Sequence, residues 1–72
     1  MKSDFGAVLR QTREEAGLTQ ADLADKAGIT RVYVGLLERG ERSPTLDVYG
    51  RLCRALHISP SKLMERFEKN MK

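Results

Sequence analysis

Hydrophobic residues recur at intervals of three and four along most of this chain, which is the pattern of amphipathic α-helices. Between these stretches, glycine, threonine, serine and proline fall where helices are expected to begin and end. The pattern predicts an all-α fold of five helices in one domain that covers residues 1–72. The predicted helices run from Ser3 to Ala16, Leu18 to Ala27, Thr30 to Arg39, Thr45 to Leu56 and Ser59 to Lys72.

The second and third predicted helices are separated by a short turn at Gly28. Glycine adopts positive φ without steric cost, so Gly28 suits the position just after a helix. Thr30 carries a hydroxyl that can cap the next helix, and Val34 and Leu37 form the apolar stripe of that helix. Ala24 is small where the two helices would cross, which allows a close approach. This arrangement is typical of a helix-turn-helix.

The other predicted helices also have residues suited to their starts, their ends and one buried face. The candidate N-terminal caps are Ser3 or Asp4, Thr19, Thr45 and Ser59, and the candidate C-terminal caps are Gly17, Gly40 and His57. The predicted buried stripes are Phe5, Leu9 and Ala16 with Val8 beside them, and Leu46, Tyr49, Leu52, Cys53 and Leu56. Charged residues fill most other positions, as expected of helices on a surface.

Composition narrows the classes of function. The net charge of +3 and the isoelectric point near 9.4 fit a nucleic-acid-binding protein without proving one. Cys53 in the apolar stripe is interpreted as a small core residue; a catalytic thiol would need a positioned base, and His57 is interpreted as a helix cap. There is no cluster of metal ligands and no glycine-rich phosphate loop, so we expect no enzyme, no cofactor and no metal site. No apolar run is long enough for a membrane span or a signal peptide, so we expect a cytoplasmic protein without a membrane partner.

Many positions at fixed spacing match one known family. The matching residues are Leu18-Thr19-Gln20, Leu23-Ala24, Gly28-Ile29-Thr30, Val34, Leu37-Glu38-Arg39-Gly40 and Ser43-Pro44. With these residues the chain resembles the XRE-type helix-turn-helix of lambdoid phage repressors, Cro proteins and the controller proteins of restriction–modification systems, over roughly Phe5 to Leu63. The resemblance implies a compact five-helix bundle of the lambda-repressor-like DNA-binding type.

The resemblance also implies a function. It indicates a sequence-specific transcriptional regulator that binds double-stranded DNA as a homodimer on a pseudo-palindromic operator, most like a restriction–modification controller. RNA polymerase is a further candidate partner. The alternative is an antitoxin-like or coactivator-like module that uses the same fold to bind a protein. A disordered binding segment would favour that alternative, and this chain has almost none.

The face of the third helix opposite Val34 and Leu37 is the candidate surface for DNA bases. Arg31 can donate two hydrogen bonds to guanine. Val32 can contact a thymine methyl, Tyr33 offers a ring and a hydroxyl, and Leu36 is either a fourth contact or an ordinary exposed leucine. Gly35 in mid-helix has two interpretations, close approach to DNA or tight packing against a neighbouring helix.

Five further residues are expected to contact phosphates: Gln20, Thr30, Arg39, Arg42 and Ser43. The backbone N–H of Gln20 lies at the positive end of a helix dipole, and the family role of a glutamine here is phosphate contact. The alternative for Gln20 is an exposed polar residue. The loop from Arg39 to Pro44 resembles the phosphate-contacting loop of the family, and its alternative is a solvated charged turn.

Two expectations concern structure. The resemblance implies that Arg13 pairs with Glu38, whereas spacing alone favours a solvated arginine. The family usually has a larger apolar residue at the position of Thr12, so we expect a thinner contact of the first helix there.

The resemblance implies that the last predicted helix and the turn before it form a two-fold dimer contact. Ile58, Met64 and Phe67 are the candidate interface residues, with Leu63 directed inward. The alternative is that Leu63 and Phe67 only close the core of the monomer.

Overall fold

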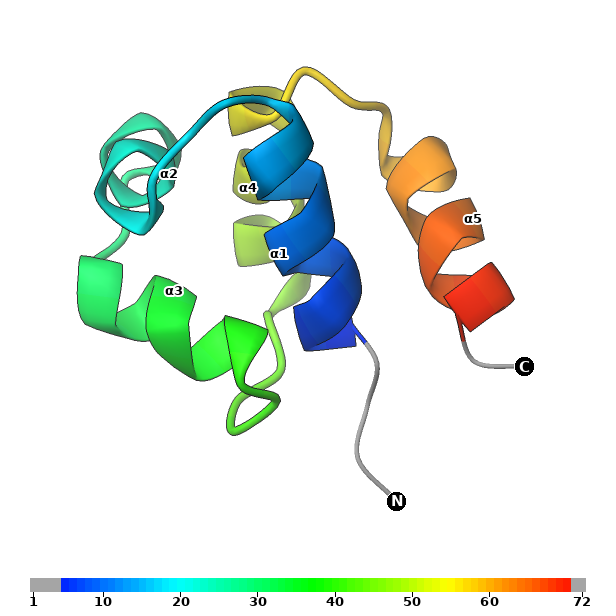
Figure 1. Ribbon diagram of the computed structural model, residues 1–72, viewed down its shortest axis with the longest axis horizontal. Helices are drawn as coiled ribbons and strands as arrows, with labels where there is room; N and C mark the ends of the chain where they lie inside the picture. The colour runs from blue at the N-terminus through cyan, green and yellow to red at the C-terminus, as the bar shows by residue number, and fades with distance from the viewer. Residues whose placement is uncertain (1–4, 71–72) are drawn as a thin grey trace.

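The computed structural model describes residues 5–70, apart from the side chain of residue 70, and this part consists of five helices without a strand. The helices are α1 (Phe5–Glu15), α2 (Gln20–Ala27), α3 (Arg31–Glu38), α4 (Leu46–Ala55) and α5 (Pro60–Asn70). In Figure 1, α1 lies in front of α4 at the centre, with α2 and α3 on one side and α5 on the other. The all-α five-helix fold is therefore confirmed. The predictions for Ser3, Asp4 and Lys72 lie outside the described residues.

Hydroxyl side chains cap four helices at the predicted places. Each accepts a hydrogen bond from the backbone N–H three residues later, which satisfies one of the free donors of the first turn. The pairs are Thr19–Asp22, Thr30–Tyr33, Thr45–Val48 and Ser59–Lys62, at 3.0, 3.0, 3.1 and 3.2 Å. Because a cap lies outside its helix, α3, α4 and α5 begin one residue later than predicted, and α2 begins two residues later.

The helix ends turn through left-handed residues, as predicted. Gly28 between α2 and α3 has φ of 71°, and Gly40 after α3 has φ of 76°. His57 takes the same conformation after α4, with φ of 54°. The backbone N–H of Ile58 then donates to the carbonyl of Cys53 at 3.0 Å and closes that helix end.

The core contains most of the residues that the apolar stripes predicted. Its members are Phe5, Val8, Leu9, Leu23, Ala24, Ala27, Val34, Leu37, Leu52, Cys53, Ala55, Leu56 and Leu63. Ala16 was predicted to be buried, and this is wrong: α1 ends at Glu15, so Ala16 lies exposed in the turn that follows. None of the helices in the described range is long and apolar enough to cross a membrane.

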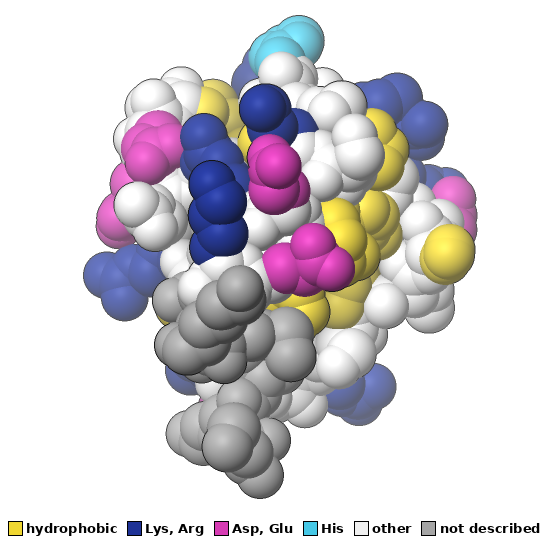
Figure 2. Space-filling model, turned by 90° about the vertical axis from the view of Figure 1, so that its right-hand side faces the viewer, with side chains coloured by type: hydrophobic (Ala, Val, Ile, Leu, Met, Phe, Trp, Pro, Cys, Tyr) yellow, Lys and Arg dark blue, Asp and Glu magenta, His cyan; other side chains and the backbone are white. Residues whose placement is uncertain are grey.

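The prediction that Leu46 is buried is also wrong. The side chain of this first residue of α4 is 78% exposed. It lines the rim of an open apolar groove between α4 and α5 instead of entering the core. Figure 2, which faces α5, shows hydrophobic side chains exposed on this face beside the charged ones.

Gly6 allows α1 to pass directly across the end of α3. A Cβ atom at this position would lie 2.3 Å from the carbonyl oxygen of Glu38 and 2.6 Å from that of Leu37. Both contacts are with backbone, which cannot move aside as a flexible side chain would. The absence of a side chain at Gly6 therefore sets the distance between α1 and the C-terminal end of α3.

Candidate nucleic-acid interface

One face of helix α3 is buried against the rest of the protein, and the opposite face is exposed. Val34 and Leu37 are fully buried against the rest of the protein. On the other side, Arg31 is exposed and the side chain of Val32 is 67% exposed. Figure 1 shows α3 along the outer edge of the molecule, where a large partner can reach it.

The other two candidate base contacts are less accessible than the spacing predicted. Tyr33 is half-buried and packs against the core. Leu36, predicted to be exposed, is half-buried as well. The base-contacting roles of all four residues stay predictions, and the exposure of Arg31 and Val32 makes these two the strongest candidates.

The last residue of α3 is held by a buried ion pair. Arg13 Nε and Nη2 donate to the two carboxylate oxygens of Glu38 at 2.6 and 3.1 Å. The two side chains are only 10% and 4% exposed. Burial and paired hydrogen bonds make this a strong form of the interaction. The pair implied by the family resemblance is thus present, and the solvated arginine that spacing favoured is wrong.

Two more hydrogen bonds extend this pair into a network. Gln20 Nε2 donates to Glu38 Oε1 at 3.0 Å, and Arg13 Nη1 donates to the carbonyl of Leu18 at 2.8 Å. The hydrogen bonds with Glu38 raise the pKa of Arg13 above its ordinary value, so the guanidinium stays charged. In the described residues no buried side-chain nitrogen or oxygen lacks a partner. The network therefore fixes the end of α3 against α1, the α1–α2 loop and the start of α2.

This network changes the interpretation of Gln20. Its side-chain amide is half-buried and bound to Glu38, so it is not the free polar group of the alternative interpretation. Its backbone N–H lies in the first turn of α2, where no intrahelical carbonyl can accept it. This backbone N–H is therefore the donor of Gln20 that can make the predicted phosphate contact.

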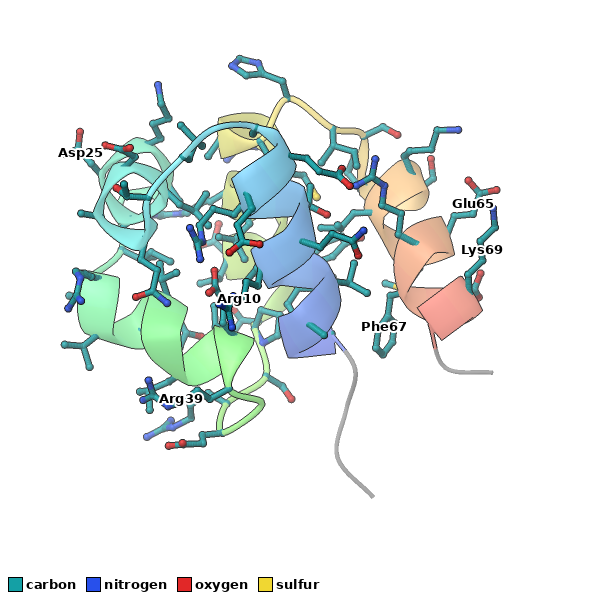
Figure 3. All side chains as sticks on the ribbon, viewed as in Figure 1. Arg10, Asp25, Arg39, Glu65, Phe67 and Lys69 are labelled. Atoms are coloured by element: carbon teal, nitrogen blue, oxygen red, sulfur yellow. The ribbon has the colours of Figure 1, made fainter. Side chains whose placement is uncertain are left out.

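The remaining candidate phosphate contacts surround the two ends of α3. The Oγ1 atom of Thr30 accepts from the backbone N–H of Tyr33, which leaves its own hydroxyl proton to donate. Arg42 and Ser43 are exposed in the loop after α3, and Arg42 has no ion pair within residues 5–70. Arg39 is exposed at the end of α3 (Figure 3) and pairs with Glu41, at 2.9 Å from Nε to Oε2.

Gly35 is buried, but no neighbouring helix packs closely against its Cβ position. A Cβ atom there would lie 3.2 Å from Arg39 Nη1 and would meet no atom of another helix within 4 Å. Helix packing, one of its two interpretations, is therefore wrong. Close approach to DNA stays a prediction. The structure adds a third interpretation, in which the missing side chain makes room for the guanidinium of Arg39.

Cys53 is a core residue, as predicted. Its side chain is only 1% exposed, and burial raises the pKa of its thiol. The same environment raises the pKa of the neighbouring Tyr49 to about 12, chiefly through burial of the phenol. The Tyr49 hydroxyl donates to the carbonyl of Pro60 at 2.6 Å, which ties α4 to the start of α5.

Two of the three predicted interface residues border the apolar groove between α4 and α5. Met64 is 42% exposed, whereas Phe67 is half-buried and meets the ring of Phe5 edge-on at a centroid distance of 5.9 Å. Ile58 is half-buried against the core, and Leu63 is fully buried as predicted. The groove also contains residues that sequence reasoning did not assign to it: Phe5, Ser43, Pro44, Leu46, Tyr49, Gly50 and Pro60.

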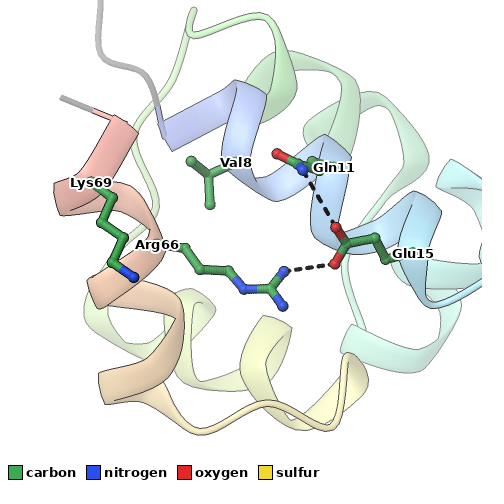
Figure 4. A pocket seen from close by; sticks show the side chains of 5 residues that line it. All are labelled: Val8, Gln11, Glu15, Arg66 and Lys69. Carbon is green, nitrogen blue, oxygen red and sulfur yellow. Dashed lines mark hydrogen bonds and ion pairs between the residues drawn. The ribbon is translucent and has the colours of Figure 1, made fainter. Parts of the chain in front are cut away.

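Helix α5 is attached to α1 by polar contacts as well as by the core. Arg66 Nη1 donates to Thr12 Oγ1 at 3.2 Å and to Glu15 Oε1 at 2.8 Å, and Figure 4 shows the second contact across a hollow between the helices. The contact of α1 at Thr12 was expected to be thin. Thr12 is buried, at 6% exposed, and its hydroxyl accepts the hydrogen bond from Arg66.

Comparisons with known proteins agree with this geometry. The profile of a family described as helix-turn-helix matches residues 9–63. Control protein C.SmaI of Serratia marcescens is 40% identical over 66 residues, which cover 92% of this chain and 79% of that protein. The crystal structure of the restriction–modification controller protein C.AhdI from Aeromonas hydrophila superposes with a TM-score of 0.82 at 43% identity, covering 85% of this chain and 92% of that one.

A longer relative is also similar. An uncharacterized HTH-type transcriptional regulator of Mycobacterium tuberculosis is 36% identical over 61 residues, 85% of this chain. The matched region spans only 44% of that relative's length. The family match and the two controller proteins nevertheless cover most of this chain. The protein therefore belongs to the XRE-type helix-turn-helix family.

Proposed function

We propose that this protein is a sequence-specific DNA-binding transcriptional regulator that places α3 in the major groove. The observation that carries the proposal is the state of α3: its outer face exposes Arg31 and Val32 while its inner face and its end are held by the core and by Glu38. The major groove is about 12 Å wide and admits an α-helix. A helix held in this way can present its side chains to base edges with little loss of backbone conformational freedom on binding.

The residues around α3 divide into two roles. Arg31, with Val32, Tyr33 and Leu36, contacts bases, and its guanidinium discriminates guanine by a pair of hydrogen bonds. Gln20, Thr30, Arg39, Arg42 and Ser43 contact phosphates, which position the protein without specifying sequence. The positions of the two exposed guanidinium groups support the division, since Arg31 is the first residue of α3 and Arg42 lies in the loop after it.

The apolar groove between α4 and α5 supports a homodimer. Leu46 and Met64 leave hydrophobic surface exposed there, and Ser43 and Pro44 of the loop after α3 line the same groove. A second copy seated in it covers this surface and brings the two loops, and hence the two α3 helices, toward each other. Two recognition helices then enter successive major grooves about 34–36 Å apart on a pseudo-palindrome.

The likeness to C.SmaI and C.AhdI supports the narrower proposal of a restriction–modification controller. Such a regulator acts in the cytoplasm, where its DNA is, and RNA polymerase is the candidate partner through which occupancy of an operator changes transcription.

The test begins with selection of bound fragments from a random duplex library. Affinity for the selected site and for random duplex is then measured at several salt concentrations. We expect log affinity to fall with log salt at a slope of about −0.9 per phosphate contacted. Arg31→Ala should weaken binding to the selected site more than to random duplex, and Arg42→Ala should weaken both alike.

Two results would count against this proposal. Flat salt dependence would favour the protein-interaction module, because an antitoxin-like role does not require phosphate contacts. An equal loss on all sequences for Arg31→Ala would remove its role in base recognition.

A further inference from the structure

The loop after α3 holds an acidic group beside a cation that is expected to contact DNA. The Nε atom of Arg39 lies 2.9 Å from Oε2 of Glu41, and the two side chains are 59% and 56% exposed. A carboxylate next to the proposed phosphate contacts repels the DNA backbone, and it occupies the Nε donor, which phosphate would use. Glu41 therefore opposes the proposed function locally.

The backbone of Glu41 is fixed by the end of α3. Gly40 turns the chain, its N–H donates to the carbonyl of Leu37 at 3.1 Å, and the N–H of Glu41 donates to that of Leu36 at 2.9 Å. This pair of bonds is a common helix-terminating motif. It holds the carboxylate at the negative end of the helix dipole, where an acid is unfavourable. A gain in fold stability therefore does not account for the glutamate, since an exposed ion pair contributes little.

The position of the Arg39 guanidinium is also defined. It lies against Gly35, where a Cβ atom would be 3.2 Å from Nη1. Val32, Gly35 and Arg39 are spaced by three and four residues and so share one side of the helix. The guanidinium thus lies on the side of α3 that exposes Val32, within reach of a duplex. The carboxylate of Glu41, in the loop after α3, pairs with it there.

We propose that Glu41 is an internal competitor of DNA phosphate for Arg39 and thereby limits the affinity of the protein for any duplex. The proposal rests on the proposed function. When the protein binds DNA, Arg39 exchanges the carboxylate for a phosphate oxygen, or keeps it on Nε and meets the phosphate with its remaining N–H groups beside a repelling charge. Either way, removing the carboxylate makes the guanidinium available at no competing cost.

The variant that tests this is Glu41→Gln, measured on random duplex and on the selected site across a range of salt. One additional phosphate contact steepens the salt slope by about 0.9, which corresponds to a gain of up to roughly eightfold in affinity at 0.1 M relative to 1 M salt. The matched control is Glu65→Gln, which removes the same charge from another exposed pair, that with Lys62. Glu65 lies on α5, across the molecule from Arg39 (Figure 3), so screening should leave its effect small.

A double variant separates competition from net charge. In the Arg39→Gln background, Glu41→Gln should raise affinity no more than the Glu65→Gln control does. The proposal is overturned if Glu41→Gln matches the control in the wild-type background, or if its gain survives loss of Arg39. Absence of salt-dependent binding by the wild-type protein would instead overturn the proposed function. Without DNA, the NMR shift of the Arg39 Nε–H group should change in Glu41→Gln, and an unchanged shift would show that the pair does not form.

Discussion

At the scale of single residues, the carboxylate of Glu38 joins the end of α3 to α1 and α2. It accepts hydrogen bonds from Nε and Nη2 of Arg13 and from Nε2 of Gln20. The ion pair with Arg13 could be predicted from the family resemblance, but the hydrogen bond from Gln20 to Glu38 could not. A glutamine at the start of a helix gives no sign in the sequence of whether its amide faces solvent or a buried acid 18 residues later.

Loss of Arg13 should therefore destabilise the fold strongly. We expect Arg13→Met to lower the free energy of unfolding by about 3–5 kcal/mol, because Glu38 is left buried and unpaired. The double variant Arg13→Met with Glu38→Met should recover much of this loss. Urea denaturation measures both. The matched control is Arg10→Met, since Arg10 pairs with Glu14 on the surface and its loss should cost at most about 1 kcal/mol. Equal losses for Arg10 and Arg13 would show that burial of the pair is unimportant.

Asp22 in the capping box of α2 should contribute to acid sensitivity. The backbone N–H and then the side chain of Thr19 lower the pKa of this carboxyl below its ordinary value. In the folded protein Asp22 thus stays ionised at a pH where the unfolded chain takes up a proton. Its contribution to stability is fully present at a pH above the ordinary pKa of an aspartate, about 3.9. The contribution is lost as the pH falls through the lower pKa of the folded protein. The free energy of unfolding of Asp22→Asn should fall less steeply with acid than that of the wild type. Parallel curves would contradict this linkage.

At the scale of helices, the sequence predicted where each helix begins and ends better than it predicted the contacts between helices. Capping side chains and turn glycines act within a few residues of chain, so Thr19, Thr30, Thr45 and Ser59 could be identified directly. Hydrophobic spacing shows which residues share a helix face, but it does not show which backbone another helix approaches. The contact of Gly6 with the end of α3 could not be found in this way.

Two helical glycines should accordingly respond in opposite directions to the same substitution. Gly6→Ala places a Cβ atom against backbone carbonyls and should destabilise the protein by about 1–3 kcal/mol, as overpacking does. Gly50→Ala meets no atom within 4 Å and should stabilise α4 by about 0.5–1 kcal/mol. Thermal denaturation monitored by circular dichroism compares them. If Gly6→Ala were as stable as the wild type, the close approach of α1 and α3 would not constrain the fold.

At the scale of the whole molecule, α2 and α3 lie on one side of α1 and α4, and α5 lies on the other (Figure 1). The apolar groove joins the two sides, because the loop after α3 lines it together with α4 and α5. The sequence predicted that α5 carries interface residues. It did not predict Leu46 there, because the spacing of Leu46 is that of a buried residue and only the packed fold shows that the core ends before it.

The groove makes a direct prediction about self-association. Leu46→Lys should shift the protein toward the monomer, because it places a charge in the apolar surface that a second copy covers in the proposed dimer. The side chain is already 78% exposed, so the monomer should keep its fold. Val32→Lys is the control, since Val32 is also exposed but lies on α3. Sedimentation equilibrium distinguishes them. A dimer of unchanged affinity in Leu46→Lys would place the interface elsewhere.

Methylation protection tests most directly whether α3 of two copies enters the major groove. Dimethyl sulfate methylates guanine N7, which lies in that groove. On a selected operator, the bound protein should protect guanines in two segments whose centres lie about 34–36 Å apart on one face of the duplex, and Arg31→Ala should remove protection at the guanine it contacts. Binding that leaves every guanine N7 open to methylation would contradict the placement of α3, and one protected segment alone would contradict the paired arrangement.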